Sequence, residues 1–178
     1  MTYKCKYAKF RSSFVPADYV PLAARSVGQH VVSANWQDDR FQLGHIVFIW
    51  GIRGKGKMVI DDQELILGSE FIGVFMPGQI LDISSLDEEW EYCWWTLDGP
   101  NAVSLVKAFG FETGIYSAGP APVNLIKMLD GIIQKPGRDW ELESAAIAYD
   151  LLSTAAKYSR PRQTTQKNEK MIDAAITL

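Results

Sequence analysis

The chain has 178 residues, of which 47% are hydrophobic, and its formal net charge is −3. These values suit one packed domain and exclude a disordered or low-complexity chain. The apolar runs are far shorter than the ~20 residues of a membrane-spanning helix, and no signal-peptide core follows the basic N-terminus. We therefore expect a cytoplasmic protein with no membrane partner. The acidic balance argues against direct nucleic-acid binding, which needs Lys and Arg to neutralise phosphates.

Residues 1–22 are predicted to form an N-terminal arm. Aromatic residues are spaced there among Lys, Ser and two prolines, without a sustained period. An arm this apolar would be prone to association if it were free. We therefore expect it to lie on the domain that follows.

Residues 23–99 are predicted to form an antiparallel β-barrel. The segment 23–34 suits one or two strands around Gly28, and 35–43 is typical of a polar loop. Beyond it, short runs rich in β-branched and aromatic residues alternate with turn signals; the runs are Ile46–Trp50, Met58–Ile60, Leu65–Leu67, Phe71–Met76 and Trp90–Leu97. So many short strands must close into a barrel or sandwich to cover their edges.

Residues 100–159 are predicted to be helical. One helix begins at Pro100 and ends before Gly110, a second covers 123–134 after a loop at 116–122, and a third begins at a capping Asp139. The third helix has a small-residue apolar face suited to close packing against a second copy. We therefore expect a homodimer through this face, which consists of Leu142, Ala145, Ala146, Tyr149, Leu152 and Ala156.

Residues 160–178 are predicted to be a linker and the start of a further domain. The segment 159–169 has a linker composition, and a new apolar periodicity begins at Lys170. That periodicity stops after nine residues, which is short for a stable helix. We therefore expect a domain beyond Leu178.

A search for catalytic or metal chemistry finds little. His30 and His45 are the only histidines, and neither has a second ligand at a metal spacing. Cys5 and Cys93 are too few for a disulfide framework. The glycines at 51, 54 and 56 lack the G-K-[ST] ending of a phosphate loop and are typical of a turn between strands. We therefore expect no metal, no cofactor and no catalytic residues.

The unusual feature is an alternation of aromatic residues along one strand. Trp90, Tyr92 and Trp94 share one face, whereas Glu91, Cys93 and Trp95 share the other. If the first face is the barrel interior, its rings line a cavity, with Trp50 on a neighbouring strand as a further candidate. Ordinary core packing is the alternative. An aromatic floor with a few hydrogen-bonding groups is also how proteins hold sugars.

Several motifs occur in a characteristic order. They are GIRGKG at 51–56, Gly68, FMPG at 75–78 and WEYCWWTLDG at 90–99. Together they resemble the effector-binding and dimerisation domain of AraC-family transcription regulators, a cupin-like arabinose-binding domain, over about residues 23–159. The resemblance implies a mainly β fold: a cupin-like antiparallel β-barrel (a double-stranded β-helix or jelly roll) followed by two or three helices.

The resemblance also implies a function and a set of binding residues. Such barrels bind a small effector, often a sugar, beneath an N-terminal arm; the terminal helices dimerise, and a separate C-terminal helix-turn-helix domain binds DNA. The implied ligand contacts are Tyr92 and Trp94 in the last strand, Arg40 after Trp36, and Ile83. The arabinose-binding member has an aromatic residue in place of Ile83 and a histidine in place of Tyr92, which points to another effector. The chain itself is expected not to bind an operator.

Two alternatives remain open at this stage. One is a stand-alone cupin enzyme that acts on sugars, such as an isomerase or epimerase. Its metal-dependent form would need histidines after the Pro77-Gly78 turn, where the chain has Gln79, Ile80, Leu81 and Asp82. The other is a barrel that serves only to dimerise.

Overall fold

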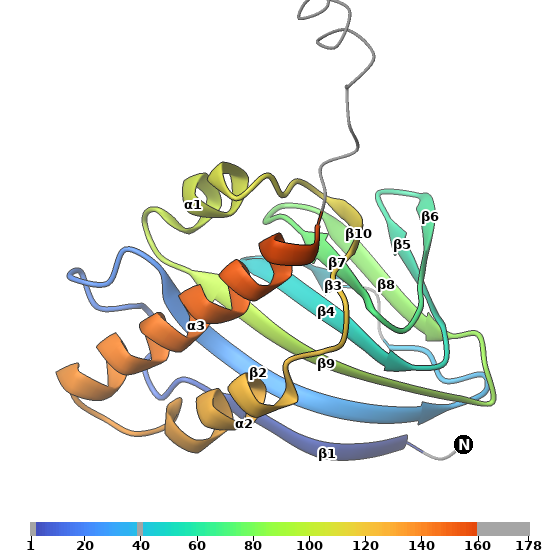
Figure 1. Ribbon diagram of the computed structural model, residues 1–178, viewed down its shortest axis with the longest axis horizontal. Coiled ribbons are helices and arrows are strands. Elements are labelled where there is room, and N and C mark those ends of the chain that lie inside the picture. Colours follow the sequence, from blue (N-terminus) through green and yellow to red (C-terminus); the bar gives the residue numbers. More distant parts are fainter. Residues whose placement is uncertain (1–2, 39–40, 160–178) are drawn as a thin grey trace, which may run out of the picture.

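Ten strands form two antiparallel sheets in the part of the chain that the computed structural model describes, residues 3–38 and 41–159 (Figure 1). The larger sheet has the order β1-β2-β9-β4-β7-β10, with strands Tyr3–Phe10, Ala23–Ser33, Glu89–Asp98, Ile46–Arg53, Phe71–Phe75 and Gly114–Ser117. The smaller sheet has the order β3-β8-β5-β6, with strands Phe41–Gln42, Ile80–Ser85, Gly56–Ile60 and Gln63–Leu67.

The strand order is that of a double-sheet jelly roll. Along the chain, β2 and β3 enter different sheets, and their later partners β9 and β8 return to the same two sheets. The inner strands repeat this arrangement, because β4 pairs with β7 while β5 pairs with β6. Such a roll covers most strand edges without a closed hydrogen-bonded ring. The predicted fold, a mainly β cupin-like barrel with C-terminal helices, is therefore confirmed.

The hydrophobic core lies in two layers, one on each face of the larger sheet. The barrel interior is filled by side chains such as Ile49, Met58, Phe75 and Trp90. A second cluster lies on the outer face of the same sheet, beneath the helices. Because β9 is buried on both faces, it carries apolar residues on both, with Trp90 and Tyr92 in the barrel interior and Cys93 and Trp95 beneath the helices.

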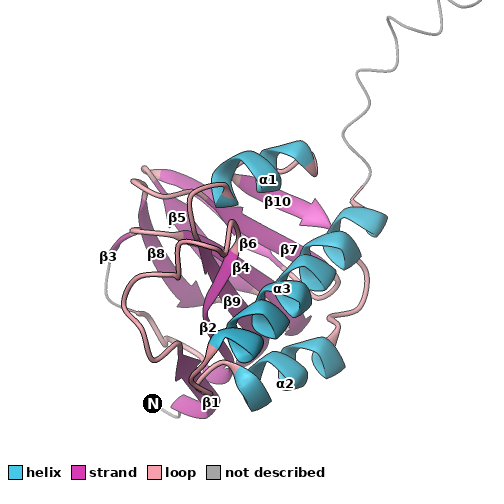
Figure 2. Ribbon diagram, turned by 90° about the vertical axis from the view of Figure 1, so that its left-hand side faces the viewer, coloured by secondary structure: helices cyan, strands magenta, loops and turns pink. Residues whose placement is uncertain are grey.

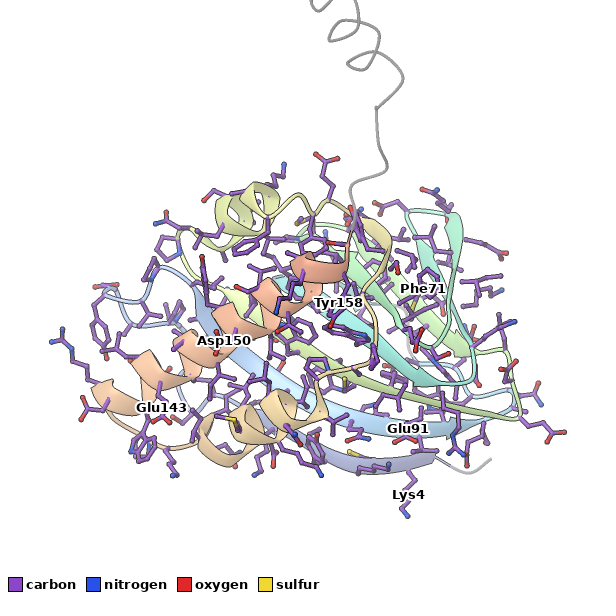
Figure 3. All side chains as sticks on the ribbon, in the orientation of Figure 1. Lys4, Phe71, Glu91, Glu143, Asp150 and Tyr158 are labelled. Atoms are coloured by element: carbon purple, nitrogen blue, oxygen red, sulfur yellow. The ribbon has the colours of Figure 1, made fainter. Side chains whose placement is uncertain are left out.

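The helices cover one face of the larger sheet. Helix α1 (Ala102–Ala108) lies near one end, while α2 (Val123–Ile132) and α3 (Arg138–Tyr158) lie side by side across β2 and β9 (Figure 2). Helix α3 buries Ile147, Ala148, Leu151, Leu152 and Ala155. Glu143 and Asp150 lie on its solvent-exposed side (Figure 3).

Four local predictions differ from the structure. Helix α3 begins at Arg138, and the residue before it, Gly137, occupies the N-cap position with a φ of 113°. Asp139 therefore lies inside the helix and is not its cap. Segments 3–10, 80–85 and 114–117 form strands β1, β8 and β10 that the sequence pattern did not predict. These three strands find their partners far along the chain, and local periodicity does not record such pairing. Segment 23–33 forms a single strand, in agreement with the one or two strands expected there.

The N-terminal arm lies on the barrel as expected, in the form of an added edge strand paired with β2. Arg11 fastens the end of this strand to the end of β9. Its guanidinium donates two hydrogen bonds, of 2.8 and 2.9 Å, to the carboxylate of Asp98. A bidentate pair of this kind fixes orientation as well as distance. Within the described residues, no helix is long and apolar enough to cross a membrane.

Candidate functional site

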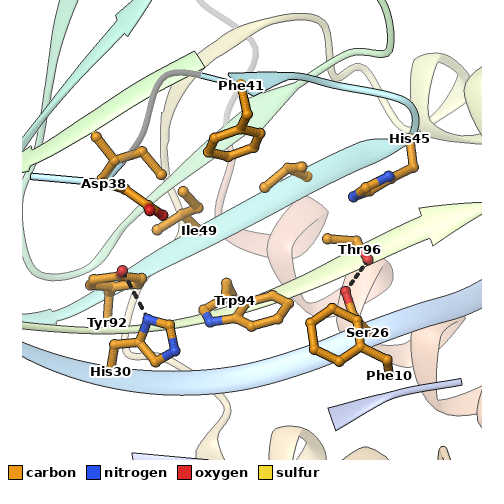
Figure 4. A pocket seen from close by; sticks show the side chains of 12 residues that line it. Phe10, Ser26, His30, Asp38, Phe41, His45, Ile49, Tyr92, Trp94 and Thr96 are labelled. Carbon is orange, nitrogen blue, oxygen red and sulfur yellow. Dashed lines mark hydrogen bonds between the residues drawn. The ribbon is translucent and has the colours of Figure 1, made fainter. Parts of the chain in front are cut away.

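A cavity of about 270 Å³ lies between the two sheets (Figure 4). This volume is close to the lower end of the ~300–1,000 Å³ typical of ligand pockets, so the cavity suits a small molecule. Both sheets and the arm contribute to its wall; the lining residues are Phe10, Ser26, His30, Asp38, Phe41, His45, Val47, Ile49, Ile83, Tyr92, Trp94 and Thr96.

The floor of the cavity is built from three cross-strand pairs of β2 and β9. The register places Ser26 opposite Thr96, Gly28 opposite Trp94, and His30 opposite Tyr92. Because alternate residues of a strand share a face, all three pairs point into the barrel. The Ser26 and Thr96 hydroxyls are hydrogen-bonded to each other, and His30 Nδ1 lies 3.1 Å from the Tyr92 hydroxyl.

The rings of the floor support one another. Trp90 stacks on Tyr92 with ring centroids 4.2 Å apart. His30 meets both Tyr92 and Trp94 edge to face, at 5.5 and 5.8 Å, and Phe10 tilts over the far side of Trp94 at 6.2 Å. Aromatic pairs in these arrangements add to the stability gained from burial alone. The floor is therefore formed by the packing of the chain's own side chains.

The remaining walls are mostly apolar. Val47 and Ile49 of β4 stand beside Thr96 and Trp94 in the register of the larger sheet. Phe41 of β3 and Ile83 of β8 approach from the smaller sheet, and Asp38 precedes them in the chain. A bound molecule would thus lie between the Trp94 indole and an apolar wall.

Both histidines of the cavity are neutral at physiological pH. Burial lowers the pKa of His30 from 6.5 to about 4. Burial, together with the positive charge of Arg25, also lowers the pKa of His45. A neutral imidazole offers one hydrogen-bond donor and one acceptor, so these groups suit polar uncharged partners.

The structure brings together three of the five predicted binding residues. Tyr92, Trp94 and Ile83 all line the cavity. Arg40 lies outside the described residues. The placement of Trp50 beside them is wrong: it stands opposite Cys93, so it faces the helices rather than the barrel interior. There it is fully buried, and its Nε1 donates a 2.8 Å hydrogen bond to the carbonyl of Gly119.

Sequence reasoning missed the contribution of β2 and of the arm. Ser26 and His30 enter the floor only through their pairing with β9, and Phe10 only through the pairing of β1. A signal was present, because the alternation that groups Tyr92 with Trp94 also extends to Thr96. The identity of the neighbouring strand could not be read from the pattern.

The turn after Pro77 has a structural role in this chain. The Gln79 side chain accepts a 2.9 Å hydrogen bond from the Met76 amide and donates one of 3.0 Å to Asp61. It thereby ties together two loops at the barrel end. Among residues 3–38 and 41–159, no three His, Cys, Asp or Glu side chains are grouped so that they could hold a metal ion.

The predicted dimerisation face of α3 is only partly available. Leu142 and Tyr149 are 42% and 47% exposed, and Ala145 and Ala156 are half-buried. The prediction that Leu152 belongs to that face is wrong, because its side chain is completely buried in the core of its own chain. The helix turns this position toward the sheet together with Ala148 and Ala155, one turn away in either direction.

Comparisons with known proteins identify similar folds only. No protein-family model and no curated protein sequence matches the chain. Among solved structures, a predicted oxalate decarboxylase from Thermotoga maritima is similar with a TM-score of 0.39 and 10% identity, over 42% of this chain and 66% of that one. Escherichia coli YhaK is similar with a TM-score of 0.45 and 13% sequence identity, over 52% of this chain and 44% of YhaK. The cupin domain of Schizosaccharomyces pombe Cnp3 is similar with a TM-score of 0.41 and 14% sequence identity, over 61% of this chain and 76% of that domain.

Proposed function

We propose that this domain senses a small, uncharged polar molecule of the saccharide class and belongs to a transcription regulator of the AraC type. The observation that carries the proposal is the preformed cavity with the Trp94 indole as its floor. One of the sequence motifs that resemble effector-binding domains, WEYCWWTLDG at 90–99, lies on β9 and supplies Tyr92, Trp94 and Thr96 to this cavity.

The arrangement of polar groups supports a ligand with a flat apolar face and polar ends. Figure 4 shows the His30–Tyr92 pair on one side of Trp94 and the Ser26–Thr96 pair on the other. A sugar ring stacks its C–H groups on an indole and directs its hydroxyls sideways to such pairs. The neutral state of both histidines disfavours an acidic sugar, because neither imidazole offers a positive charge to a carboxylate.

The proposal includes a route from ligand to partner. The strands β2 and β9 that form the cavity floor carry α2 and α3 on their opposite face. Trp94 faces the ligand, while the next residue, Trp95, is packed in one cluster with Ala148 and Leu151 of α3. A homodimer formed through the exposed Leu142 and Tyr149 side of α3 would therefore sense ligand binding through a single layer of sheet.

In this proposal the chain is a binding domain and not an enzyme, and contact with DNA belongs to a separate domain. Elemental analysis of protein purified without chelators tests the first statement. One transition metal bound per chain would favour the cupin enzyme instead. A gel-shift assay of residues 1–178 is expected to show no specific operator complex.

A thermal-shift screen tests the binding function directly. The panel contains pentoses, hexoses, uronic acids and disaccharides, applied to the wild type, to Trp94→Ala and to Ile66→Ala as an exposed control on β6. A ligand at about 100 times its Kd stabilises the fold by roughly 2.7 kcal/mol, which raises Tm by about 5–10 °C for a domain of this size. We expect such a shift in the wild type and the control but not in Trp94→Ala. A shift that survives in Trp94→Ala would place the site elsewhere.

A further inference from the structure

The Trp94 indole lies directly against the backbone of Gly28. A Cβ atom added at Gly28 would stand 2.6 Å from Cε2 and Cζ2 of the indole and 2.7 Å from its Nε1. Carbon atoms in contact are normally about 3.5–4.0 Å apart. Any side chain at position 28 would therefore force the ring to move.

Glycine is not required at this position by the backbone. Gly28 lies in the middle of β2, between Ala8 of β1 and Trp94 of β9, and its φ is outside the left-handed region. A glycine in a strand interior costs conformational entropy and often marks the close approach of another group. Here the group that approaches is the indole.

The ring has one direction in which to move. His30 stands against one side of Trp94 and Phe10 against the other, and Ile49 stands beside it on β4. A ring pushed away from Gly28 would therefore rise into the cavity of about 270 Å³. The volume open to a ligand depends on how close the indole lies to β2.

We propose that Gly28 is the residue that sets the depth of the cavity: it lets the Trp94 indole lie against β2 and so leaves space for a ligand of one ring. This inference rests on the proposed binding function of the cavity. According to this inference, the absence of a side chain at position 28 determines which size of ligand fits. Larger residues at position 28 are therefore predicted to close the site.

Benzyl alcohol is a suitable probe, because it is uncharged and has one ring and one hydroxyl. Its affinity is measured by saturation-transfer NMR on the wild type, Gly28→Ala, Trp94→Leu and the double variant. Gly44→Ala is the matched control, because its added methyl group has no atom within 4 Å. In parallel, 5-fluorotryptophan labelling gives resonances for the six tryptophans, and loss of one resonance in Trp94→Phe identifies position 94.

We expect Gly28→Ala to shift the Trp94 resonance and to weaken benzyl alcohol binding by about tenfold or more. The same substitution in the Trp94→Leu background is expected to change affinity by less than about twofold, because the clashing ring is gone. Gly44→Ala is expected to behave as the wild type. If Gly28→Ala fails to fold while the double variant folds, the conflict with the indole is confirmed.

Three results of the resonance and binding measurements would overturn the inference. They are an unmoved Trp94 resonance in Gly28→Ala, equal affinity of the wild type and Gly28→Ala for the probe, and absence of benzyl alcohol binding to the wild type. Loss of folding in the double variant as well would also contradict it, because the conflict would then involve another group. The saccharide screen is judged separately: benzyl alcohol binding without any sugar response would leave the role of Gly28 standing and refute the saccharide.

Discussion

Two neighbouring tryptophans on opposite faces of β9, Trp94 and Trp95, differ in how completely they are packed. On the outer face, Trp95 is fully buried and stacks on Phe48, with ring centroids 4.7 Å apart and planes 4° apart. On the inner face, Trp94 is only half-buried and borders a cavity. The two residues are adjacent in sequence and chemically identical, so only the direction of the side chain separates them.

Under the proposed function, this difference lets one strand serve both stability and binding. The outer face gains free energy from close packing against the helices, whereas at Trp94 the inner face gives up part of that gain and borders an open cavity. A binding site that is preformed in this way does not have to be opened by the ligand, so less of the interaction energy is lost on binding.

The largest difference in stability is expected between substitutions on the buried side and on the exposed side of α3. Leu152→Glu would place a charge among fully buried apolar side chains and is expected to cost more than about 4 kcal/mol, so that the domain no longer folds. Leu142→Glu lies on the exposed side and is expected to change stability by less than about 0.5 kcal/mol while converting a dimer to a monomer. Urea denaturation and sedimentation measure the two effects. A Leu142→Glu variant of unchanged mass would place the dimer interface on another surface.

The next largest difference is expected between alanine substitutions of the two tryptophans. Trp95→Ala is expected to cost about 3–5 kcal/mol, because it leaves a cavity in the packed outer layer. Trp94→Ala is expected to cost about 1–2 kcal/mol and to abolish the response to the ligand. Chemical denaturation gives both losses, and ligand titration of Trp94→Ala gives the second readout. Equal losses in stability would refute the difference in packing between the two faces.

A pH titration sharpens the comparison at the inner face. The pKa of His30 is about 4 in the folded protein, against an ordinary value of 6.5, so the unfolded chain binds the proton more tightly. Stability contributed by neutral His30 is therefore complete above pH 6.5 and is lost as the pH falls toward 4. The loss corresponds to about 3 kcal/mol, at about 1.36 kcal/mol per pKa unit.

The variant His30→Asn is expected to remove most of this loss. Urea denaturation between about pH 4 and pH 7 measures it for the wild type and the variant. The variant Gln37→Ala serves as a control, because its exposed side chain does not titrate. Parallel pH profiles for the wild type and His30→Asn would show that another group is responsible.

The sequence pattern predicted well what depends on local alternation. The assignment of Tyr92 and Trp94 to one face of β9 and of Cys93 and Trp95 to the other agrees with the two core layers. It failed for Trp50, because deciding its face required knowing that Trp50 stands opposite Cys93. A shift of one residue in register exchanges the two faces of a strand, and periodicity does not fix the register.

Helix α3 shows the same limit in another form. Its length and position were predicted, but its two apolar sides could not be told apart from spacing alone. Leu142 and Leu152 are ten residues apart, which on a helix of 3.6 residues per turn places them about 80° from each other. One is exposed and the other is buried, and the deciding factor is the sheet on which the helix rests.

The smallest effect concerns a glycine with no neighbour. Gly131 lies near the end of α2, and a Cβ added there has no atom within 4 Å. Gly131→Ala is therefore expected to stabilise the domain by about 0.5–1 kcal/mol, through the helix propensity of alanine and the smaller entropy of the unfolded chain. Gly28→Ala makes the same chemical change on the opposite side of the sheet and is expected to destabilise the domain, because its methyl group meets the Trp94 ring. Urea denaturation of both variants measures whether each substitution raises or lowers the free energy of unfolding. If Gly28→Ala also stabilised the domain, the indole would not depend on the space that Gly28 leaves.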